Sequence, residues 1–261
     1  MAALLRVENL SKSFGGLAAL RDLSFEVEQG AIVGLIGPNG AGKTTAFNLI
    51  SGTLRPSAGR VWFRDVDITG GPPSRVVGLG LARTFQHTSI YPAASVRDNV
   101  YRGAIARLGT SMFDQLRGGV RTREGLARIE SQVDEVLEIM GLEAHRDSIA
   151  GALSYGQQKR LGVAIGLATQ PTLLLLDEPA AGLNPEESAE FGRLLRGLRE
   201  RLDLTLLLVE HHMALVMDLC ERIVVLVQGA RIAEDVPAAI ARHPAVIEAY
   251  LGSEEDDHAR G

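Results

Sequence analysis

The sequence is built around the stretch Gly37-Pro38-Asn39-Gly40-Ala41-Gly42-Lys43-Thr44-Thr45, which fits the pattern G-x-x-x-x-G-K-[ST]. Residues 31–36 before it form a short apolar run that predicts a buried β-strand. Residues 44–50 after it can continue as a helix, and Gly52 is placed to end that helix. The pattern and its context therefore predict a strand, a glycine-rich loop and a helix in direct succession.

The residue types of this loop suit the binding of phosphate. Its glycines lack a Cβ atom, so the backbone can close around a phosphate with its N–H groups pointing inward. The following helix adds the positive end of its dipole, and Lys43 adds a full positive charge for β- and γ-phosphates. The Thr44 hydroxyl can ligate Mg²⁺, and the N–H and hydroxyl of Thr45 lie nearby. The loop resembles that of P-loop nucleotide hydrolases; the alternative is a glycine-rich turn that contains Lys-Thr by chance.

Length and composition bound the class of protein. With 261 residues, 46% of them hydrophobic, the chain can hold one large domain or two small ones around a sizeable core. The net charge of −5 argues against a general nucleic-acid binder and leaves open only a local basic patch. The single cysteine, Cys220, excludes an intrachain disulfide, and with no secretory leader this favours a reducing cytosol. No apolar run approaches the roughly 20 residues that a spanning helix needs, so we expect a soluble protein or one bound to a membrane through a partner.

The order of patterns along the chain favours an α/β fold. In the first part, strands are expected at 4–10, 23–27, 60–63 and 81–85, with a turn at 11–16. From Val96 to about Ala168 good helix formers dominate, with helical spacing from Ile129 to Met140, a stop at Gly141, and a loop or short helices at 109–125. In the last part, we expect strands at 172–176, 204–209 and 223–227, helices at 185–201 and 213–219, and a hairpin turn at 228–231.

Two adjacent acids follow the apolar run Leu173–Leu176, which reads as a strand buried on both faces. Ligands bind at the carboxyl ends of strands in open α/β sheets, and this is where Asp177 and Glu178 fall. Asp177 would hold Mg²⁺, through its water shell, because Mg²⁺ dehydrates reluctantly. Glu178 would accept a proton from an attacking water. The alternative for the two acids is a solvated strand end.

The stretch Leu153-Ser154-Tyr155-Gly156-Gln157-Gln158-Lys159-Arg160 resembles the LSGGQ signature of ATP-binding cassette (ABC) proteins, with Tyr155 in place of the first glycine. A helix is expected from Gln157 to Ala168, and Asp177 follows Gln157 by 20 residues, as the family pattern requires. Ser154 and the N–H groups of Gly156 and Gln157 stand at a helix N-terminus and suit an anion. The resemblance implies that this anion is the γ-phosphate held by the loop of a second subunit. Capping of the helix by Ser154 is compatible with that role.

The resemblance assigns further roles one residue at a time. Phe14 stands where an aromatic ring stacks on adenine, although it could equally be a core residue. Gln86 resembles the glutamine that reaches Mg²⁺ and the attacking water and that connects to the helical insert. Asn184, in 181–185, stands where the segment that crosses the dimer interface usually has an acid, so a hydrogen-bonding side chain is kept and a charge is lost. His211 matches the histidine that binds the γ-phosphate, and a shift of one residue would give that role to His212.

The resemblance covers residues 4–252 and implies a fold class. That class is an α/β P-loop nucleotide hydrolase core of the ABC ATPase type, with an N-terminal antiparallel β subdomain and an inserted helical subdomain. We therefore expect one ABC ATPase domain over 1–252, with the helical subdomain at about 96–168. Residues 253–261 are acidic and without apolar pattern, which predicts a disordered tail.

Four segments are similar to the ATPase subunits of branched-chain amino acid importers: 83–86, the long stretch between Gln86 and the signature, 180–185 and 248–252. Among these subunits, the segment 103–128 is similar to the larger of the two. The resemblance implies an ATP-hydrolysing subunit that uses ATP and Mg²⁺ to power uptake of branched-chain or other hydrophobic amino acids, or of a related small solute.

The resemblance also implies partners and a location. The partners are transmembrane permease subunits, a second ABC ATPase chain in a homo- or heterodimer and, indirectly, an extracytoplasmic solute-binding protein; nucleic acid is not among them. The location is the cytoplasmic face of the plasma (inner) membrane, where the chain is peripheral and held by its partners.

Two alternatives are considered, one of them a different transport function and the other a different functional class. An ATPase of a lipopolysaccharide or lipid exporter has a similar cassette, but the extra residues between Gln86 and Leu153 argue against it. A non-transport ABC ATPase of DNA repair would need a long coiled coil before the signature, and one of translation would need two cassettes. Neither requirement is met by this chain.

Overall fold

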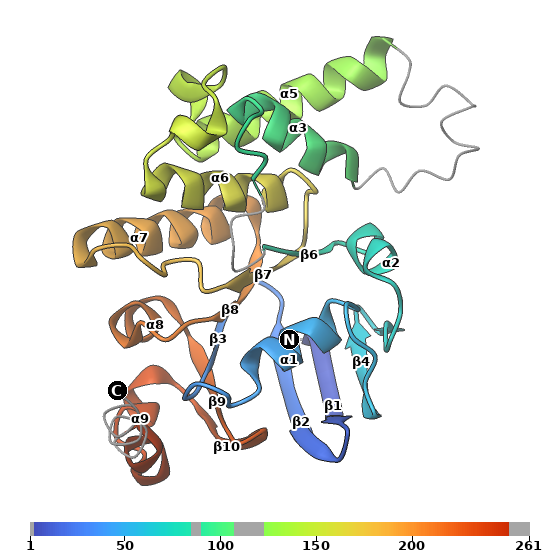
Figure 1. The fold of residues 1–261 in the computed structure, drawn as a ribbon, viewed down its shortest axis with the longest axis vertical. Coiled ribbons are helices and arrows are strands. Elements are labelled where there is room, and N and C mark those ends of the chain that lie inside the picture. The colour runs from blue at the N-terminus through green and yellow to red at the C-terminus, as the bar shows by residue number, and fades with distance from the viewer. Residues whose placement is uncertain (1–2, 85–89, 107–122, 251–261) are drawn as a thin grey trace.

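The structure, a computed structural model, describes residues 3–84, 90–106 and 123–250 (Figure 1). Glu143–His145 and Ala150–Ala152 form two short 3₁₀ turns. The helices and strands in chain order are β1 (Ala3–Phe14), β2 (Leu17–Glu28), β3 (Ile32–Ile36), α1 (Lys43–Ile50), β4 (Ala58–Phe63), β5 (Val66–Asp67), α2 (Pro73–Gly78), β6 (Leu81–Arg83), α3 (Val96–Ala106), α5 (Arg123–Ile139), α6 (Tyr155–Leu167), β7 (Leu173–Asp177), α7 (Pro185–Leu202), β8 (Thr205–Val209), α8 (Met213–Leu219), β9 (Arg222–Val227), β10 (Ala230–Asp235) and α9 (Pro237–Ile240).

A six-stranded sheet of order β10-β9-β3-β8-β7-β6 runs through the centre of the molecule. Its strands are parallel except for β10, which pairs antiparallel with β9. Strands β3, β7 and β8 are buried along their whole length, which explains their continuous apolar sequences. Because the carboxyl ends of parallel strands meet at one edge, the residues that follow β3, β7 and β8 are brought together there.

The central sheet separates two hydrophobic cores, because successive side chains of a strand point to opposite faces. On one face, Leu174 and Leu176 of β7 pack with helices α3, α5, α6, α7 and α8. On the other face, Leu173 and Leu175 pack with α1 and with strands β1, β2 and β4. Figure 1 shows the helices α3, α5 and α6 gathered at one end and the strands β1, β2 and β4 at the other.

Strands β1, β2, β4 and β5 form a second sheet of order β2-β1-β4-β5, which confirms the predicted antiparallel β subdomain. The predicted turn at 11–16 is wrong, because β1 continues to Phe14 and only Gly15 and Gly16 turn. Strand β2 correspondingly begins at Leu17 rather than at residue 23. The polar residues read as a turn are used within the sheet: the Asp22 N–H donates to Ser11 Oγ at 2.9 Å where the strand register shifts.

The predicted helical insert contains α3, α5 and α6, which pack against one another. Gly141 ends the α5 segment with a φ of +64°, as predicted from its position. The segment predicted as loop or short helices lies mainly outside the described residues, as do Phe85, Gln86 and the acidic tail 253–261. The extent of the single domain over 1–252 stays a prediction.

The contact between α3 and α6 depends on Gly103. A Cβ atom there would lie 2.3 Å from the carbonyl oxygen of Ile165 on α6. We therefore expect Gly103→Ala to force the two helices apart and to lower the free energy of unfolding by about 1–3 kcal/mol. Urea denaturation measures this loss.

The matched control for Gly103→Ala is Gly197→Ala in α7, where a Cβ atom would meet nothing within 4 Å. Alanine at an open helical position should raise stability, by up to about 1 kcal/mol. Equal shifts in the two variants would contradict the close packing of α3 on α6.

Candidate functional site

The glycine-rich loop connects β3 to α1 and fits closely against neighbouring backbone. Gly37 has a φ of +152°, and a Cβ atom there would lie 2.1 Å from the carbonyl oxygen of Leu226. Gly42 has a φ of +101°, and its Cβ would lie 2.7 Å from the carbonyl oxygen of Ala19. Both positions exclude a side chain, as the sequence pattern predicts. Helix α1 starts at Lys43, so the positive end of its dipole adjoins the loop.

The Lys43 ammonium is buried within this loop. Its Nζ donates to the carbonyl oxygens of Gly37 at 2.6 Å and of Pro38 at 2.9 Å. Burial lowers the pKa of Lys43, and the nearby carboxylates of Glu178 and Asp177 partly oppose this shift. Lys43 and the two acids that follow β7 are therefore close enough to interact electrostatically, although Lys43 and Asp177 are 134 positions apart in the sequence.

Asp177 is the last residue of β7, and its side chain is almost fully buried. Its Oδ2 atom accepts from Arg83 Nη2 at 2.8 Å. Its Oδ1 atom is buried and has no hydrogen-bond partner within the described part of the chain. A buried carboxylate oxygen without a partner is unfavourable unless a cation or water meets it, so this atom suits the predicted contact with hydrated Mg²⁺.

Arg83 also belongs to the site, although no role was predicted for it. Besides Asp177, its Nη1 atom donates to Asn48 Oδ1 at 2.7 Å and to Ser51 Oγ at 3.2 Å. Arg83 ends β6, which runs parallel to β7, so the strand ends bring the two charges together. A lone arginine at the end of an apolar strand could have indicated a buried ion pair. Its partner could not be predicted, because the sequence does not show which strand lies beside it.

Removing the guanidinium of Arg83 should be costly, because Asp177 would remain buried with an unpaired charge. We expect Arg83→Met to lower the free energy of unfolding by about 3–5 kcal/mol, measured by urea denaturation. The control is Arg196→Met, whose partner Asp218 is mostly exposed; loss of that pair should cost at most about 1 kcal/mol. Similar losses in both variants would show that the buried pair has no special role.

Glu178 and His211 follow the neighbouring strands β7 and β8. The Glu178 N–H donates to the Val209 carbonyl at 2.9 Å, and its φ of +47° is unusual for a residue with a side chain. His211 Nδ1 lies 3.8 Å from Glu178 Oε1, and 58% of the His211 side chain is exposed. His212 instead shares a hydrogen bond of 2.8 Å between its Nδ1 and Ser188 Oγ of α7. The geometry therefore places His211, and not His212, beside Glu178.

A second residue without a predicted role, Glu210, supports this part of the site. Its side chain is fully buried, and its Oε1 atom accepts from the Ala180 N–H at 2.8 Å. Its Oε2 atom accepts from the N–H groups of His211 at 3.2 Å and His212 at 3.3 Å. Glu210 thus joins the segment after Glu178 to the segment that carries His211.

The signature stretch forms the start of α6. Ser154 caps this helix: its Oγ accepts from the Gln157 N–H at 3.3 Å, and Gln157 Oε1 accepts from the Ser154 N–H at 3.0 Å. Helix α6 begins at Tyr155, two residues earlier than predicted. Tyr155 Oη donates to the carbonyl of Ala181, which the sequence did not indicate. Helices α6 and α1 pack on opposite faces of the central sheet.

Phe14 lies at the end of β1, with 48% of its surface exposed. Lys12 Nζ lies 5.0 Å from the centroid of its ring. The exposure excludes the core position that was the alternative for Phe14.

Asn184 caps α7, with its Oδ1 accepting from the Glu187 N–H at 2.9 Å, and this explains how an amide can replace an acid there.

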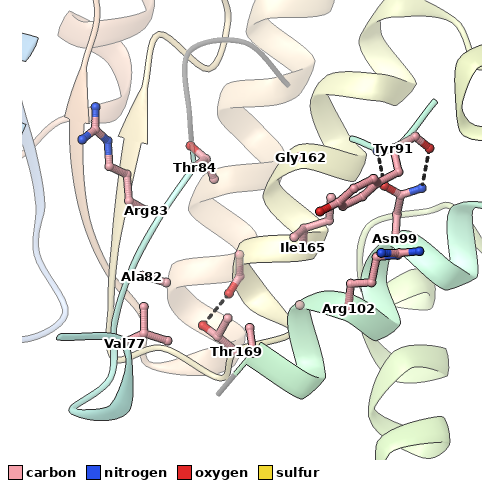
Figure 2. Close-up of a pocket in the computed structure, with 13 residues that line it drawn as sticks. Val77, Ala82, Arg83, Thr84, Tyr91, Asn99, Arg102, Gly162, Ile165 and Thr169 are labelled. Carbon is pink, nitrogen blue, oxygen red and sulfur yellow. Dashed lines mark hydrogen bonds between the residues drawn. The ribbon is translucent and has the colours of Figure 1, made fainter. Parts of the chain in front are cut away.

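A pocket of about 280 Å³ lies where the helical layer meets strand β6. Figure 2 shows Tyr91 paired by two hydrogen bonds with Asn99 of α3, while the Arg83 guanidinium points away from that pair. Arg102 stacks its guanidinium 4.3 Å from the centroid of the Tyr91 ring. Gln86, predicted to reach Mg²⁺ and to connect to the helical insert, falls outside the described residues.

Comparison with known proteins gives the family. Residues 20–181 match the family model described as "ABC transporter", and residues 230–256 match "Branched-chain amino acid ATP-binding cassette transporter". No helix in the ranges that the structure describes is long and apolar enough to cross a membrane.

Two curated relatives and one solved structure illustrate the similarity. The chain is 41% identical to the "high-affinity branched-chain amino acid transport ATP-binding protein LivG" of Salmonella typhimurium, over 95% of this chain and 98% of that protein. It is 35% identical to the "lipopolysaccharide export system ATP-binding protein LptB" of Acidithiobacillus ferridurans, over 97% and 99%. The crystal structure of the ADP conformation of MJ1267, "an ATP-binding cassette of an ABC transporter", superposes with a TM-score of 0.85 and 31% identity, over 97% and 100%. The chain belongs to the ATP-binding proteins of ABC transporters.

Proposed function

We propose that this chain hydrolyses ATP to power an importer of branched-chain or other hydrophobic amino acids, or of a related small solute. The observation that carries the ATPase part is the gathering of Lys43, Asp177, Glu178 and His211 where β3, β7 and β8 end. A cation, a metal-binding acid, a base and a histidine at one sheet edge are the parts that phosphoryl transfer to water needs.

In this proposal Glu178 is the general base. Its carboxylate accepts a proton from the water that attacks the γ-phosphorus, while His211, at 3.8 Å from it, donates a hydrogen bond to the γ-phosphate. Lys43 moves from the carbonyls of Gly37 and Pro38 to the β- and γ-phosphates, which offer stronger, charge-assisted bonds. The remaining loop residues, from Pro38 to Thr45, surround the phosphates with backbone N–H groups.

Mg²⁺ fits the same place. We propose Thr44, Gln86 and Asp177 as its ligands, and the buried Oδ1 atom of Asp177 supports this choice. When bound, Mg²⁺ neutralises charge on the β- and γ-phosphates. The chain's own contribution is Arg83, which fixes the orientation of the Asp177 carboxylate.

The signature is proposed to bind a second nucleotide, held by another copy or a related chain. Ser154, Gly156 and Gln157 lie at the N-terminal end of α6, whereas the glycine-rich loop leads into α1 on the opposite face of the sheet. Two phosphate-binding elements on opposite faces suit a head-to-tail pair in which each ATP lies between one loop and the partner's signature. The exposed ring of Phe14 would stack on the adenine of its own nucleotide.

The transport class is supported by relatives and by the chain's C-terminal segment. LivG is named for branched-chain amino acid transport, and the family matched by residues 230–256 is named for it too. The lower identity to LptB keeps lipopolysaccharide export as the second candidate. Transmembrane permease subunits would dock at the pocket between β6 and α3 and hold the chain at the cytoplasmic face of the membrane. An extracytoplasmic solute-binding protein would act through those subunits.

Co-purification tests the transport class. Tagged Glu178→Gln protein is purified from gently solubilised cells with Mg-ATP present, and a preparation without nucleotide is the control. Permease subunits with a second ATPase chain support the importer, and branched-chain amino acids should then stimulate ATP hydrolysis by the reconstituted complex. A lipid-export assembly would overturn the substrate class alone, whereas ribosomes or nucleic acid without membrane subunits would overturn transport.

A further inference from the structure

Two side chains of α6 contact the segment that begins with Glu178. The first is Tyr155, whose hydroxyl donates to the carbonyl of Ala181 at 3.0 Å. Its ring lies against Gly182, where a Cβ atom would be 2.9 Å from ring atom Cε1 and the φ is +81°. The Tyr155 side chain is therefore fitted to the backbone of residues 181–182 by a hydrogen bond and by shape.

The second side chain is Lys159, one helical turn further along the same face of α6. Its Nζ atom donates to the carbonyl of Glu178 at 3.3 Å and lies 5.4 Å from the centroid of the Tyr155 ring. Lys159 is only 6% exposed, and burying an ammonium is unfavourable unless it makes a specific contact. That contact is with the backbone of Glu178, which has the left-handed conformation that non-glycine residues seldom adopt.

We infer that Tyr155 and Lys159 are positioning residues for Glu178, so that α6 supports the proposed base. The inference rests on the proposed function, in which Glu178 acts as that base. The same end of α6 carries Ser154 and Gln157, which are proposed to bind the nucleotide held by the partner. A displacement of α6 at the nucleotide held by the partner would therefore be transmitted to Glu178, the base that acts on the nucleotide held by its own chain.

Packing alone does not account for the pair. Tyr155 is 50% exposed, so burial of its ring contributes little to the core. The hydrogen bonds of both side chains go to backbone carbonyls of the segment 178–181. Loss of either bond should therefore change the position of this segment more than the stability of the fold.

The test uses single variants of the full-length chain. Tyr155→Phe removes only a hydroxyl, and Lys159→Met keeps the aliphatic stem. We expect kcat for ATP hydrolysis to fall about 3- to 10-fold in the first and about 10- to 100-fold in the second, the ranges for losing a neutral or a charged hydrogen bond. The KM for ATP should stay within about twofold of the wild-type value, because neither side chain is among the groups proposed to bind the nucleotide.

The matched control is Arg160→Gln, which should keep the wild-type kcat. Arg160 lies on the same helix but bonds Glu190 of α7, at 2.6 Å, and no residue of 178–182. A second measurement separates positioning from a general loss of structure. If Lys159 acts through the Glu178 carboxylate, Lys159→Met should lower the slow single-turnover rate of Glu178→Gln no further.

Wild-type kcat values in Tyr155→Phe and Lys159→Met would overturn the inference while leaving the proposed function intact. The inference would also be overturned if Lys159→Met lowered the rate of ATP hydrolysis by the same factor in the wild-type chain and in Glu178→Gln. That pattern would indicate a structural defect. If the wild-type chain does not hydrolyse ATP, or if Glu178→Gln hydrolyses it at the wild-type rate, the proposed function fails and this inference fails with it.

Discussion

Replacing Glu178 by glutamine should slow ATP hydrolysis by at least about 10²–10⁴-fold, or about 3–5 kcal/mol in the activation barrier. The amide keeps the size and the hydrogen-bonding capacity of the side chain but cannot accept the proton of the attacking water. Binding of ATP should be unchanged, because Glu178 interacts with Lys43 at a distance and forms none of the glycine-rich loop. With ATP bound and not hydrolysed, the variant should accumulate as a dimer, measured by size-exclusion chromatography with light scattering.

The control for Glu178→Gln is Glu186→Gln. Glu186 is an exposed acid in the first turn of α7, so this variant makes the same chemical change outside the site. Its turnover should match the wild-type value. Turnover of Glu178→Gln within a few-fold of wild type would rule out Glu178 as the base and would direct attention to His211.

The second large effect is expected for Lys43→Ala, which should bind ATP about 10- to 150-fold more weakly. This range corresponds to about 1.5–3 kcal/mol for hydrogen bonds to a charged group. The fold should persist, because the Nζ partners in the part of the chain that the structure describes are the carbonyls of Gly37 and Pro38, which can be solvated when the side chain is removed. Isothermal titration with ATP measures the affinity, and thermal unfolding of the same sample checks the fold.

Arg242→Ala serves as the control, since it removes one positive charge from an exposed position near the C-terminal end. It should bind ATP like the wild type, which separates the local role of Lys43 from the net charge. A wild-type affinity in Lys43→Ala would mean that the loop does not grip the phosphates through this side chain.

Much of the site follows from local sequence. Residues 31–52 specify the glycine-rich loop, the strand before it and the helix after it. The loop geometry depends on its glycines, and the strand and the helix are indicated by the spacing of their apolar residues. The turn predicted at 11–16 failed for the opposite reason: Ser11 looks like a turn residue, but its hydroxyl completes an irregular strand pairing with Asp22. Local propensity could not foresee a partner on another strand.

The chemistry proposed for this protein can be predicted from three short motifs: a phosphate-binding loop, two acids after a buried strand, and a signature that resembles that of the ABC family. These signals are contiguous, so their physical meaning does not depend on the rest of the chain. Which distant groups meet depends instead on the folded sheet, because strand order is a property of the whole sheet. It paired Arg83 with Asp177, placed His211 rather than His212 beside Glu178, and brought Tyr155 and Lys159 of α6 onto the backbone of the proposed base.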